Sequence, residues 1–409
     1  MSRSTATARA VQEAESETVL DVTDLKTHFL TARGRVRAVD GVSLTLKRGN
    51  TLGIVGESGS GKTIFSRSVM NLLPKENVRR SGSVMFLGQE LMDLDAKSMR
   101  RLCGADVAMV FQDPMSSLNP VMTIGKQITE SLRLHLGMNR HESKDTAVAL
   151  LRSVNIPEAE RRFAEYPHQL SGGMRQRVMI ALALACGPRL LFADEPTTAL
   201  DVTVQAEILN LLQDQQADRF MAMVLITHDL GVVAGRTDEI AVMYAGKVVE
   251  QAATSVLFSK MRHPYTEALL RSIPKIDNPS HTRLRVITGR PPDLLHPPPG
   301  CPFAPRCPYV GDDCRAEMPP LEYDEAAGHR FACFHPLGSA ENAAALERNL
   351  AEGLPQAIAL LDSKEGHEID LSTLLAAETA NGATLAFEHH EPELTHEDES
   401  TRHEATLDE

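Results

Sequence analysis

The feature that most constrains this sequence is a glycine-rich octapeptide, GESGSGKT, at residues 56–63. It follows a short apolar run, Thr51–Val55, and precedes a segment with Phe65 and Val69 at helical spacing. The octapeptide fits G-x-x-x-x-G-K-[ST], in which glycines let successive backbone N–H groups turn toward one anion. Its members are Gly56, Glu57, Ser58, Gly59, Ser60, Gly61, Lys62 and Thr63. A strand, a phosphate-binding loop and a helix in this order predict an α/β fold.

The residues that close the octapeptide indicate which phosphates bind. Lys62 supplies a point charge suited to β- and γ-phosphates, and the Thr63 hydroxyl is suited to ligate Mg²⁺. The positive end of the following helix favours the same anion. We therefore expect ATP and Mg²⁺ as the bound cofactors.

Two carboxylates follow a second buried strand. The apolar run Leu190–Ala193 ends at Asp194 and Glu195, and α/β sheets place ligands at the carboxyl ends of their strands. Asp194 is suited to hold Mg²⁺, directly or through water, and Glu195 to act as general base toward the attacking water. Together with the phosphate-binding loop, the pair predicts hydrolysis of the triphosphate.

A second glycine turn opens another helix without a following lysine, at residues 170–176, LSGGMRQ. One phosphate chain in one site cannot easily use both turns. The heptapeptide resembles the signature of ABC ATPases, and the expected contact residues within it are Ser171, Gly172, Gly173 and Gln176.

Further residues match this family in order. Gln112 matches its Q-loop, Asp201 its D-loop and His228 its switch histidine. Phe29 stands where the family places an aromatic ring against adenine, although the neighbouring His28 competes for that role.

The resemblance implies a head-to-tail dimer of cassettes. Residues 171–173 would contact the γ-phosphate held on the partner's loop, with Gln176 and Asp201 beside it. Gln112 would help to bind Mg²⁺ and would respond both to this ion and to the membrane partner. His228 would hold the γ-phosphate and the attacking water in place.

The segment after the cassette narrows the resemblance to one branch. Three stretches resemble the C-terminal extension of oligopeptide and dipeptide importer ATPases, a branch that also contains nickel importers. They are HPYTEALL at 263–270, ITGRPP at 287–292 and GCPFAPRCP at 300–308. This branch implies a second ABC ATPase subunit (a heterodimer is favoured over a homodimer), two permease subunits and an extracytoplasmic substrate-binding protein. The expected location is the cytoplasmic face of the cell membrane, peripherally on the permeases.

Four cysteines cluster in this extension: Cys301, Cys307, Cys314 and Cys333. Their spacing lacks the C-x₂₋₄-C pairs usual in structural zinc sites, whereas four thiolates are also the ligand set of a [4Fe–4S] cluster. Cluster-bearing members of this branch favour the same interpretation. Zinc or unligated thiols remain the alternatives.

The expected fold is a P-loop ABC-type nucleotide-binding domain with an antiparallel β subdomain and a helical subdomain. We place a disordered N-terminus at 1–18, the ATPase domain at 19–262 with a helical insertion at about 114–168, the extension at 263–336 and an acidic, largely disordered tail at 337–409. The net charge of −13 belongs to this tail, which holds 17 acidic and 3 basic side chains.

Composition limits the alternatives. The near-neutral body and the absence of tryptophan argue against nucleic acid as a partner. A soluble ABC ATPase without a transporter usually carries two cassettes, a coiled-coil insertion or a basic face, and the sequence predicts none of them. The leading interpretation is a subunit that hydrolyses ATP to energise peptide uptake. Import of nickel or another small solute is the alternative within the branch.

Overall fold

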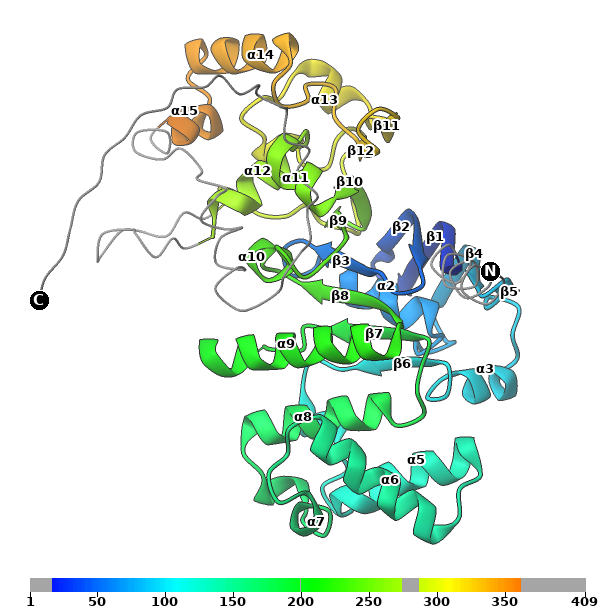
Figure 1. The fold of residues 1–409 in the computed structure, drawn as a ribbon. Helices are drawn as coiled ribbons and strands as arrows, with labels where there is room; N and C mark the ends of the chain where they lie inside the picture. The colour runs from blue at the N-terminus through cyan, green and yellow to red at the C-terminus, as the bar shows by residue number, and fades with distance from the viewer. Residues whose placement is uncertain (1–16, 199, 274–286, 362–409) are drawn as a thin grey trace, which may run out of the picture.

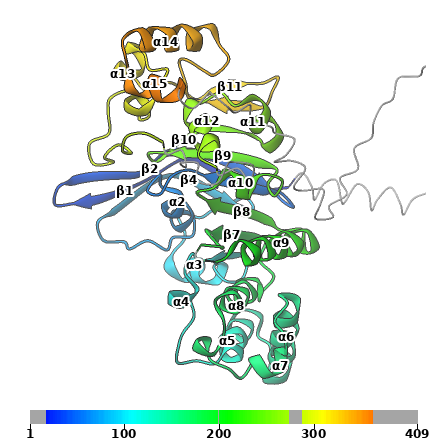
Figure 2. The ribbon, with the colours of Figure 1, turned by 90° about the vertical axis from the view of Figure 1, so that its left-hand side faces the viewer.

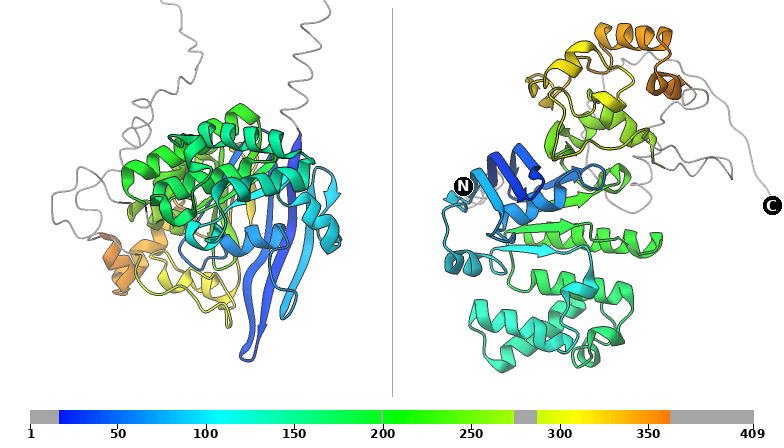
Figure 3. Two further views of the ribbon diagram at one scale, coloured as in Figure 1. Left: turned by 90° about the horizontal axis from the view of Figure 1, so that it is seen from below. Right: turned by 180° about the vertical axis from the view of Figure 1, so that it is seen from behind.

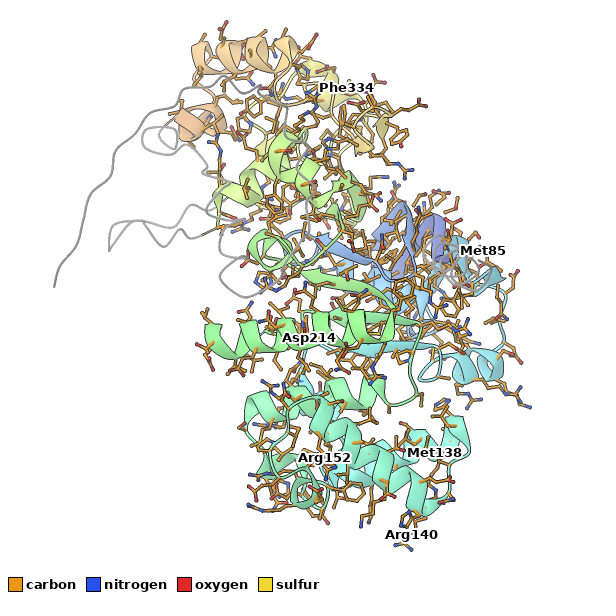
Figure 4. The ribbon with its side chains drawn as sticks, in the orientation of Figure 1. Met85, Met138, Arg140, Arg152, Asp214 and Phe334 are labelled. Carbon is orange, nitrogen blue, oxygen red and sulfur yellow. The ribbon has the colours of Figure 1, made fainter. Side chains whose placement is uncertain are left out.

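The computed structural model describes residues 17–198, 200–273 and 287–361 (Figure 1). Three parts follow one another along its long axis in Figures 1 and 2: the C-terminal extension, a central α/β part with two sheets, and a group of helices. Phe334 of the extension and Arg140 of the helical part lie at opposite ends of the molecule (Figure 4). The ATPase core therefore lies between two appendages.

The larger sheet has eight strands in the order β11-β12-β10-β9-β3-β8-β7-β6. Its five strands from β9 to β6 are parallel, and β3, β6, β7 and β8 are buried along their whole length, as strands covered on both faces are. The bounds are β3 Thr51–Val55, β6 Val107–Val110, β7 Leu190–Asp194, β8 Ala222–Thr227, β9 Glu239–Tyr244, β10 Lys247–Ala253, β11 Glu322–Asp324 and β12 His329–Phe331. The carboxyl ends of β3, β7 and β8 lead into the candidate site.

The smaller sheet is antiparallel, in the order β2-β1-β4-β5, and projects to one side of the core (Figure 3). Its strands are β1 Thr18–Thr31, β2 Gly34–Lys47, β4 Val78–Phe86 and β5 Gln89–Glu90. Helix α2, Lys62–Val69, contacts β1 and β2 on one side and β7 of the larger sheet on the other. Phe65 and Val69 of this helix join a core with Leu20 and Leu44. The helix that begins at the phosphate-binding loop is thus fixed by both sheets.

The helical part comprises α4 Pro114–Ser117, α5 Ile124–Leu136, α6 Arg140–Ser153, α7 Ala159–Arg162, the 3₁₀ turn η1 Pro167–Gln169 and α8 Gly172–Leu184. Ile124, Ile128 and Leu132 of α5 recur every four residues and are fully buried, as expected for one face of an amphipathic helix. Asn139 and Glu142 form a reciprocal capping box that begins α6.

The remaining helices of the core are α3 Ala96–Leu102, α9 Val202–Arg219, α10 Leu230–Val233, α11 Thr254–Lys260 and α12 Pro264–Arg271. Within the described part of the chain, no helix combines the length and the apolar character needed to cross a bilayer.

The extension is joined to the core through the larger sheet. Strand β12 pairs with β10, with Glu250 opposite Phe331, so one sheet runs across the expected boundary between cassette and extension. The other elements of the extension are η2 Ala304–Arg306 and α13 Asp312–Ala316.

The expectation of a largely disordered tail from residue 337 is wrong for its first part. Helices α14, Ala340–Ala351, and α15, Pro355–Leu361, are packed on the extension (Figure 1). Ser339 caps α14, Ala345 is buried, and the Asn349 amide donates to the carbonyls of Pro308 and Val310 at 2.9 and 3.0 Å. Sparse apolar residues stabilise these helices because the neighbouring extension supplies the other half of the contact. Residues 362–409, and residues 1–16 of the expected disordered N-terminus, lie outside the described residues.

Candidate functional site

The phosphate-binding loop lies between β3 and α2. Gly61 precedes the helix with φ of +105°, and a Cβ at this position would lie 2.3 Å from the carbonyl oxygen of Ala38. Any residue other than glycine would therefore meet both backbone strain and a steric clash. The local sequence explains why the loop can curl against β2 and direct its N–H groups outward.

Lys62 begins α2 and reaches back over the loop. Its Nζ donates to the carbonyl oxygens of Gly56 at 2.6 Å and Glu57 at 3.0 Å. Burial lowers the pKa of this ammonium, and the charges of Glu195, Asp194 and Glu57 oppose that shift. A phosphate that displaced the two carbonyl contacts would meet a cation already desolvated by the protein.

A hydroxyl and a carboxylate converge beside this lysine. Thr63 Oγ1 donates to Asp194 Oδ1 at 2.9 Å across 131 residues of sequence. Asp194 is 1% exposed, burial raises its pKa, and its Oδ2 has no hydrogen-bond donor among the described residues. An orphaned buried carboxylate oxygen next to a hydroxyl is the hard oxygen donor set that Mg²⁺ prefers. The residues present therefore fit Mg²⁺.

Glu195 lies at the end of β7 in a left-handed backbone conformation, φ +46°, which is uncommon for a residue with a side chain. Gln112 Nε2 and Thr198 Oγ1 donate to its Oε2 at 2.8 and 3.0 Å. His228 Nδ1 lies 3.5 Å from Oε1. The interaction with His228 lowers the pKa of Glu195, so this side chain is an ionised carboxylate at neutral pH.

One cavity brings most of the predicted nucleotide residues together. Its lining includes loop residues, Gln112, Glu195, His228 and residues far away in sequence; the full set is Phe29, Val36, Ala38, Glu57, Ser58, Gly59, Gly61, Lys62, Thr63, Ile64, Gln112, Glu195, His228, Leu269, Ser272, Ile287, Pro291 and Leu294. His28 is not among them, because its Nε2 is 2.9 Å from Asp40 Oδ1 in a pair directed elsewhere. Phe29 is thus the aromatic residue of the pair that faces the cavity.

The second glycine turn and Asp201 lie outside this cavity. Ser171 caps α8 and is exposed, and Asp201 caps α9 and is exposed. The two helix starts are neighbours, since a Cβ on Gly173 would lie 3.0 Å from Val204. Gln176 also lies outside the cavity and is buried, with its side chain 2% exposed, and its contact with a neighbour's nucleotide stays a prediction.

The four cysteines of the extension line a second cavity. Cys301, Cys307, Cys314 and Cys333 are free thiols that meet there with His263 and Phe303, among others. Burial raises the pKa of each thiol, and for Cys307 the other three cysteines act in the same direction. Asp313 and His335 bring a carboxylate and an imidazole within 4.8 Å of the Cys314 thiol.

Comparison with known proteins matches both parts of the chain. Residues 39–198 match the family model of the ABC transporter, and residues 249–314 match that of the oligopeptide/dipeptide transporter C-terminal region. The chain is 47% identical to the oligopeptide transport ATP-binding protein OppD of Salmonella typhimurium over 337 residues, which cover 82% of this chain and 99% of the relative. The chain belongs to the ABC transporter ATP-binding proteins.

Other relatives agree with this assignment. The ABC ATPase is 48% identical to the dipeptide transport ATP-binding protein DppD of Escherichia coli over 322 residues, 79% of this chain and 98% of the relative. Among solved structures, the ATP-binding cassette MJ0796, a dimer bound to ADP and Pi, matches 57% of this chain and 98% of its own with a TM-score of 0.52 and 27% identity. The expected fold, an ABC cassette with antiparallel and helical parts, is confirmed.

The sequence did not indicate that the extension of this ABC ATPase reaches the nucleotide cavity. Ile287, Pro291 and Leu294 form part of its wall, and the Arg37 N–H donates to the Leu294 carbonyl at 3.1 Å. Arg306 bonds to the Glu57 carboxylate. One signal was present: the acidic Glu57 inside a phosphate-binding loop would repel phosphate unless a cation neutralised it.

Proposed function

We propose that this ABC ATPase energises the uptake of dipeptides or oligopeptides across the cytoplasmic membrane. The observation that carries the proposal is the convergence of Lys62, Thr63 and Glu195 on one cavity, with Asp194 bonded to Thr63 behind it. The extension of the same chain matches the oligopeptide/dipeptide transporter region. The grouping of these side chains supports hydrolysis of ATP, and the match of the extension supports peptides as the transported solute.

In this proposal Lys62 binds the β- and γ-phosphates, and backbone N–H groups of the loop that have no partner among the described residues donate to them. Thr63 and Asp194 hold Mg²⁺, with Gln112 as a further ligand. Bound there, Mg²⁺ would supply positive charge that neutralises the phosphate oxygens. Glu195 accepts the proton of the attacking water, since its carboxylate is ionised and lines the cavity. His228 orients the same water and the γ-phosphate.

A second cassette completes the nucleotide-binding site. The exposed Ser171 and the glycines after it lie outside this chain's own cavity, which supports their contact with a γ-phosphate held by a neighbour, with Asp201 beside them. The dimeric state of the cassette MJ0796 with ADP and Pi supports the same arrangement. We propose a heterodimer with a related subunit.

This pair is proposed to bind two permease subunits on the cytoplasmic side, in a system that also includes an extracytoplasmic substrate-binding protein. The test is co-expression with two permease subunits and a related ATPase subunit from the same source, followed by purification and reconstitution in lipid vesicles. We expect the subunit to co-purify, and a peptide-loaded binding protein to stimulate phosphate release. Stimulation by Ni²⁺ or another solute, but not by peptides, would overturn the cargo class, and failure to co-purify would overturn the transport function.

The four cysteines are proposed to hold a [4Fe–4S] cluster. Four free thiols, three of them buried, share one largely apolar cavity, and thiolates in such a place require a cationic centre to be stable. The donor set therefore fits the cluster, which would stabilise the short elements of the extension. Protein purified without oxygen should contain iron and sulfide and show visible charge-transfer absorption. The Cys307→Ser variant should lose the iron, the sulfide and the absorption. Zinc in place of iron, or no metal, would contradict the proposal.

A further inference from the structure

Glu57 in the phosphate-binding loop forms a bidentate ion pair with the extension. Arg306 Nη1 donates to Glu57 Oε2 at 2.5 Å, and Nη2 donates to Oε1 at 2.9 Å, across 249 residues of sequence. Paired N–H donors on one carboxylate fix direction as well as distance. The loop is therefore attached to the extension in one defined geometry.

Arg306 is held rigidly on its other sides. Its side chain is 2% exposed. Nε donates to the Thr288 carbonyl at 2.9 Å, Nη2 to the Ile287 carbonyl at 3.1 Å, and Nη1 to the Tyr244 hydroxyl at 3.2 Å. An arginine with this many fixed partners loses little further freedom when it positions a carboxylate.

Glu57 transmits this position to the phosphate site through its backbone. Its N–H donates to the Tyr265 hydroxyl at 2.8 Å, and its carbonyl accepts from Lys62 Nζ at 3.0 Å. Tyr265 lies on α12, fully buried. The residue that contacts the phosphate-binding lysine is thus held at its N–H by one residue of the C-terminal half and at its carboxylate by another.

The ion pair with Arg306 also neutralises the negative charge that Glu57 brings to the phosphate-binding loop. Glu57 lines the nucleotide cavity, so its unneutralised carboxylate would repel a triphosphate. Arg306 does not line that cavity, and it stands directly before Cys307 in the sequence. Arg306 contacts two residues of the cavity wall, Glu57 and Ile287, and of these only Glu57 carries a charge that acts on a nucleotide.

We propose that Arg306 is a positioning residue for ATP binding: it neutralises Glu57 and fixes the phosphate-binding loop from the cysteine-containing extension. The inference rests on the nucleotide site described above. It assigns the extension a part in binding the nucleotide, in addition to any role of its cysteines.

The test is a double-mutant cycle in the assembled complex, with N-methylanthraniloyl-ATP and Mg²⁺ as the probe. Arg306→Met should raise the Kd about tenfold, with KM for ATP changed more than kcat. In the Glu57→Gln background the same substitution should change the Kd less than about threefold, because its partner charge is already gone. Arg306→Lys, which keeps the charge, should recover part of the affinity.

Arg315→Met is the matched control. Arg315 follows Cys314 directly, as Arg306 precedes Cys307, yet its side chain is 55% exposed, and among the described residues its ion pair is with the exposed Asp312. We expect parental affinity. Iron content is measured in every variant. A variant that loses ATP affinity but keeps its iron has a displaced phosphate-binding loop, whereas one that loses both has a damaged cysteine site.

Several outcomes overturn the inference. Parental affinity in Arg306→Met refutes it while leaving ATP binding by the parent intact. An equal loss with and without Glu57→Gln shows that Arg306 acts only on stability of the extension, as does a loss that follows iron content. If the parent complex does not bind the probe saturably, the nucleotide site itself is wrong, and the inference fails with it.

Discussion

Replacing Glu195 with glutamine removes one charge and one base from the nucleotide cavity while keeping the shape of the side chain. The carboxylate is held by Gln112 and Thr198 on Oε2 and lies near His228 on Oε1. A glutamine carbonyl oxygen can accept the first two hydrogen bonds unchanged. The substitution therefore tests proton acceptance without dismantling the group of side chains.

The size of the expected effect follows from the role of Glu195 as a positioned general base. A positioned general base contributes about 10²–10⁴-fold to a rate, which corresponds to about 3–5 kcal/mol of activation free energy. The rate of hydrolysis should fall by at least about a hundredfold. ATP affinity should stay the same or rise, because a carboxylate held ionised by His228 no longer faces the triphosphate.

The assay is phosphate release by the reconstituted complex, together with binding of the fluorescent ATP analogue. Glu207→Gln is the control, since Glu207 is an exposed glutamate paired with Arg177 on α8, and it should keep the parental rate. Hydrolysis at the parental rate in Glu195→Gln would refute the role of Glu195 as base. A parallel loss of ATP affinity would show that the residue acts in binding instead.

Phe29→Ala should weaken ATP binding by about 1–3 kcal/mol without abolishing it, if the ring stacks on the base; an unchanged Kd would remove the ring from the base site. Asp194→Asn should raise the Mg²⁺ concentration for half-maximal hydrolysis at least about tenfold; an unchanged Mg²⁺ requirement would contradict its role. His263 is buried, and burial lowers its pKa from 6.5 to about 4. The unfolded chain takes up this proton first, so the free energy of unfolding should be at its full value above pH 6.5 and fall by up to about 3 kcal/mol as the pH drops toward 4. His263→Asn, which can still cap α12, should flatten this decline in thermal unfolding curves, and an equally steep decline would contradict the assignment.

Local patterns predicted much of the core. The strands Thr51–Val55 and Leu190–Asp194 both lie where the sequence placed them. Each is an apolar run, so its structure is decided within a few residues.

Other elements depend on distant contacts that no local pattern shows. Strand β4 contains Arg79, Arg80 and Gly82, poor signals for a strand, and is fixed by pairing with β1. Helices α14 and α15 occur in a short stretch with alanine and leucine ahead of the acidic end of the chain, and the extension provides the surface on which they pack.

The candidate site shows the same division. The sequence identified Lys62, Thr63, Asp194 and Glu195, because each follows a recognisable strand end or glycine loop. It missed Thr198, which bonds to Glu195 from only three residues away, and Arg306, which reaches Glu57 through a tertiary contact. It also did not show that Gln176 is buried. Side-chain exposure is a property of packing, and spacing alone does not determine it.

The central claim is that one triphosphate is bound between the phosphate-binding loop of one cassette and the serine–glycine turn of the other. The most direct measurement is a structure of the Glu195→Gln complex with Mg²⁺ and ATP. The account predicts Ser171 and Gly173 within hydrogen-bond distance of the γ-phosphate bound by the other cassette, and Lys62 moved from the Gly56 and Glu57 carbonyls onto phosphate oxygens. Closed cassettes with ATP bound and Ser171 turned away from the neighbouring phosphate would contradict it.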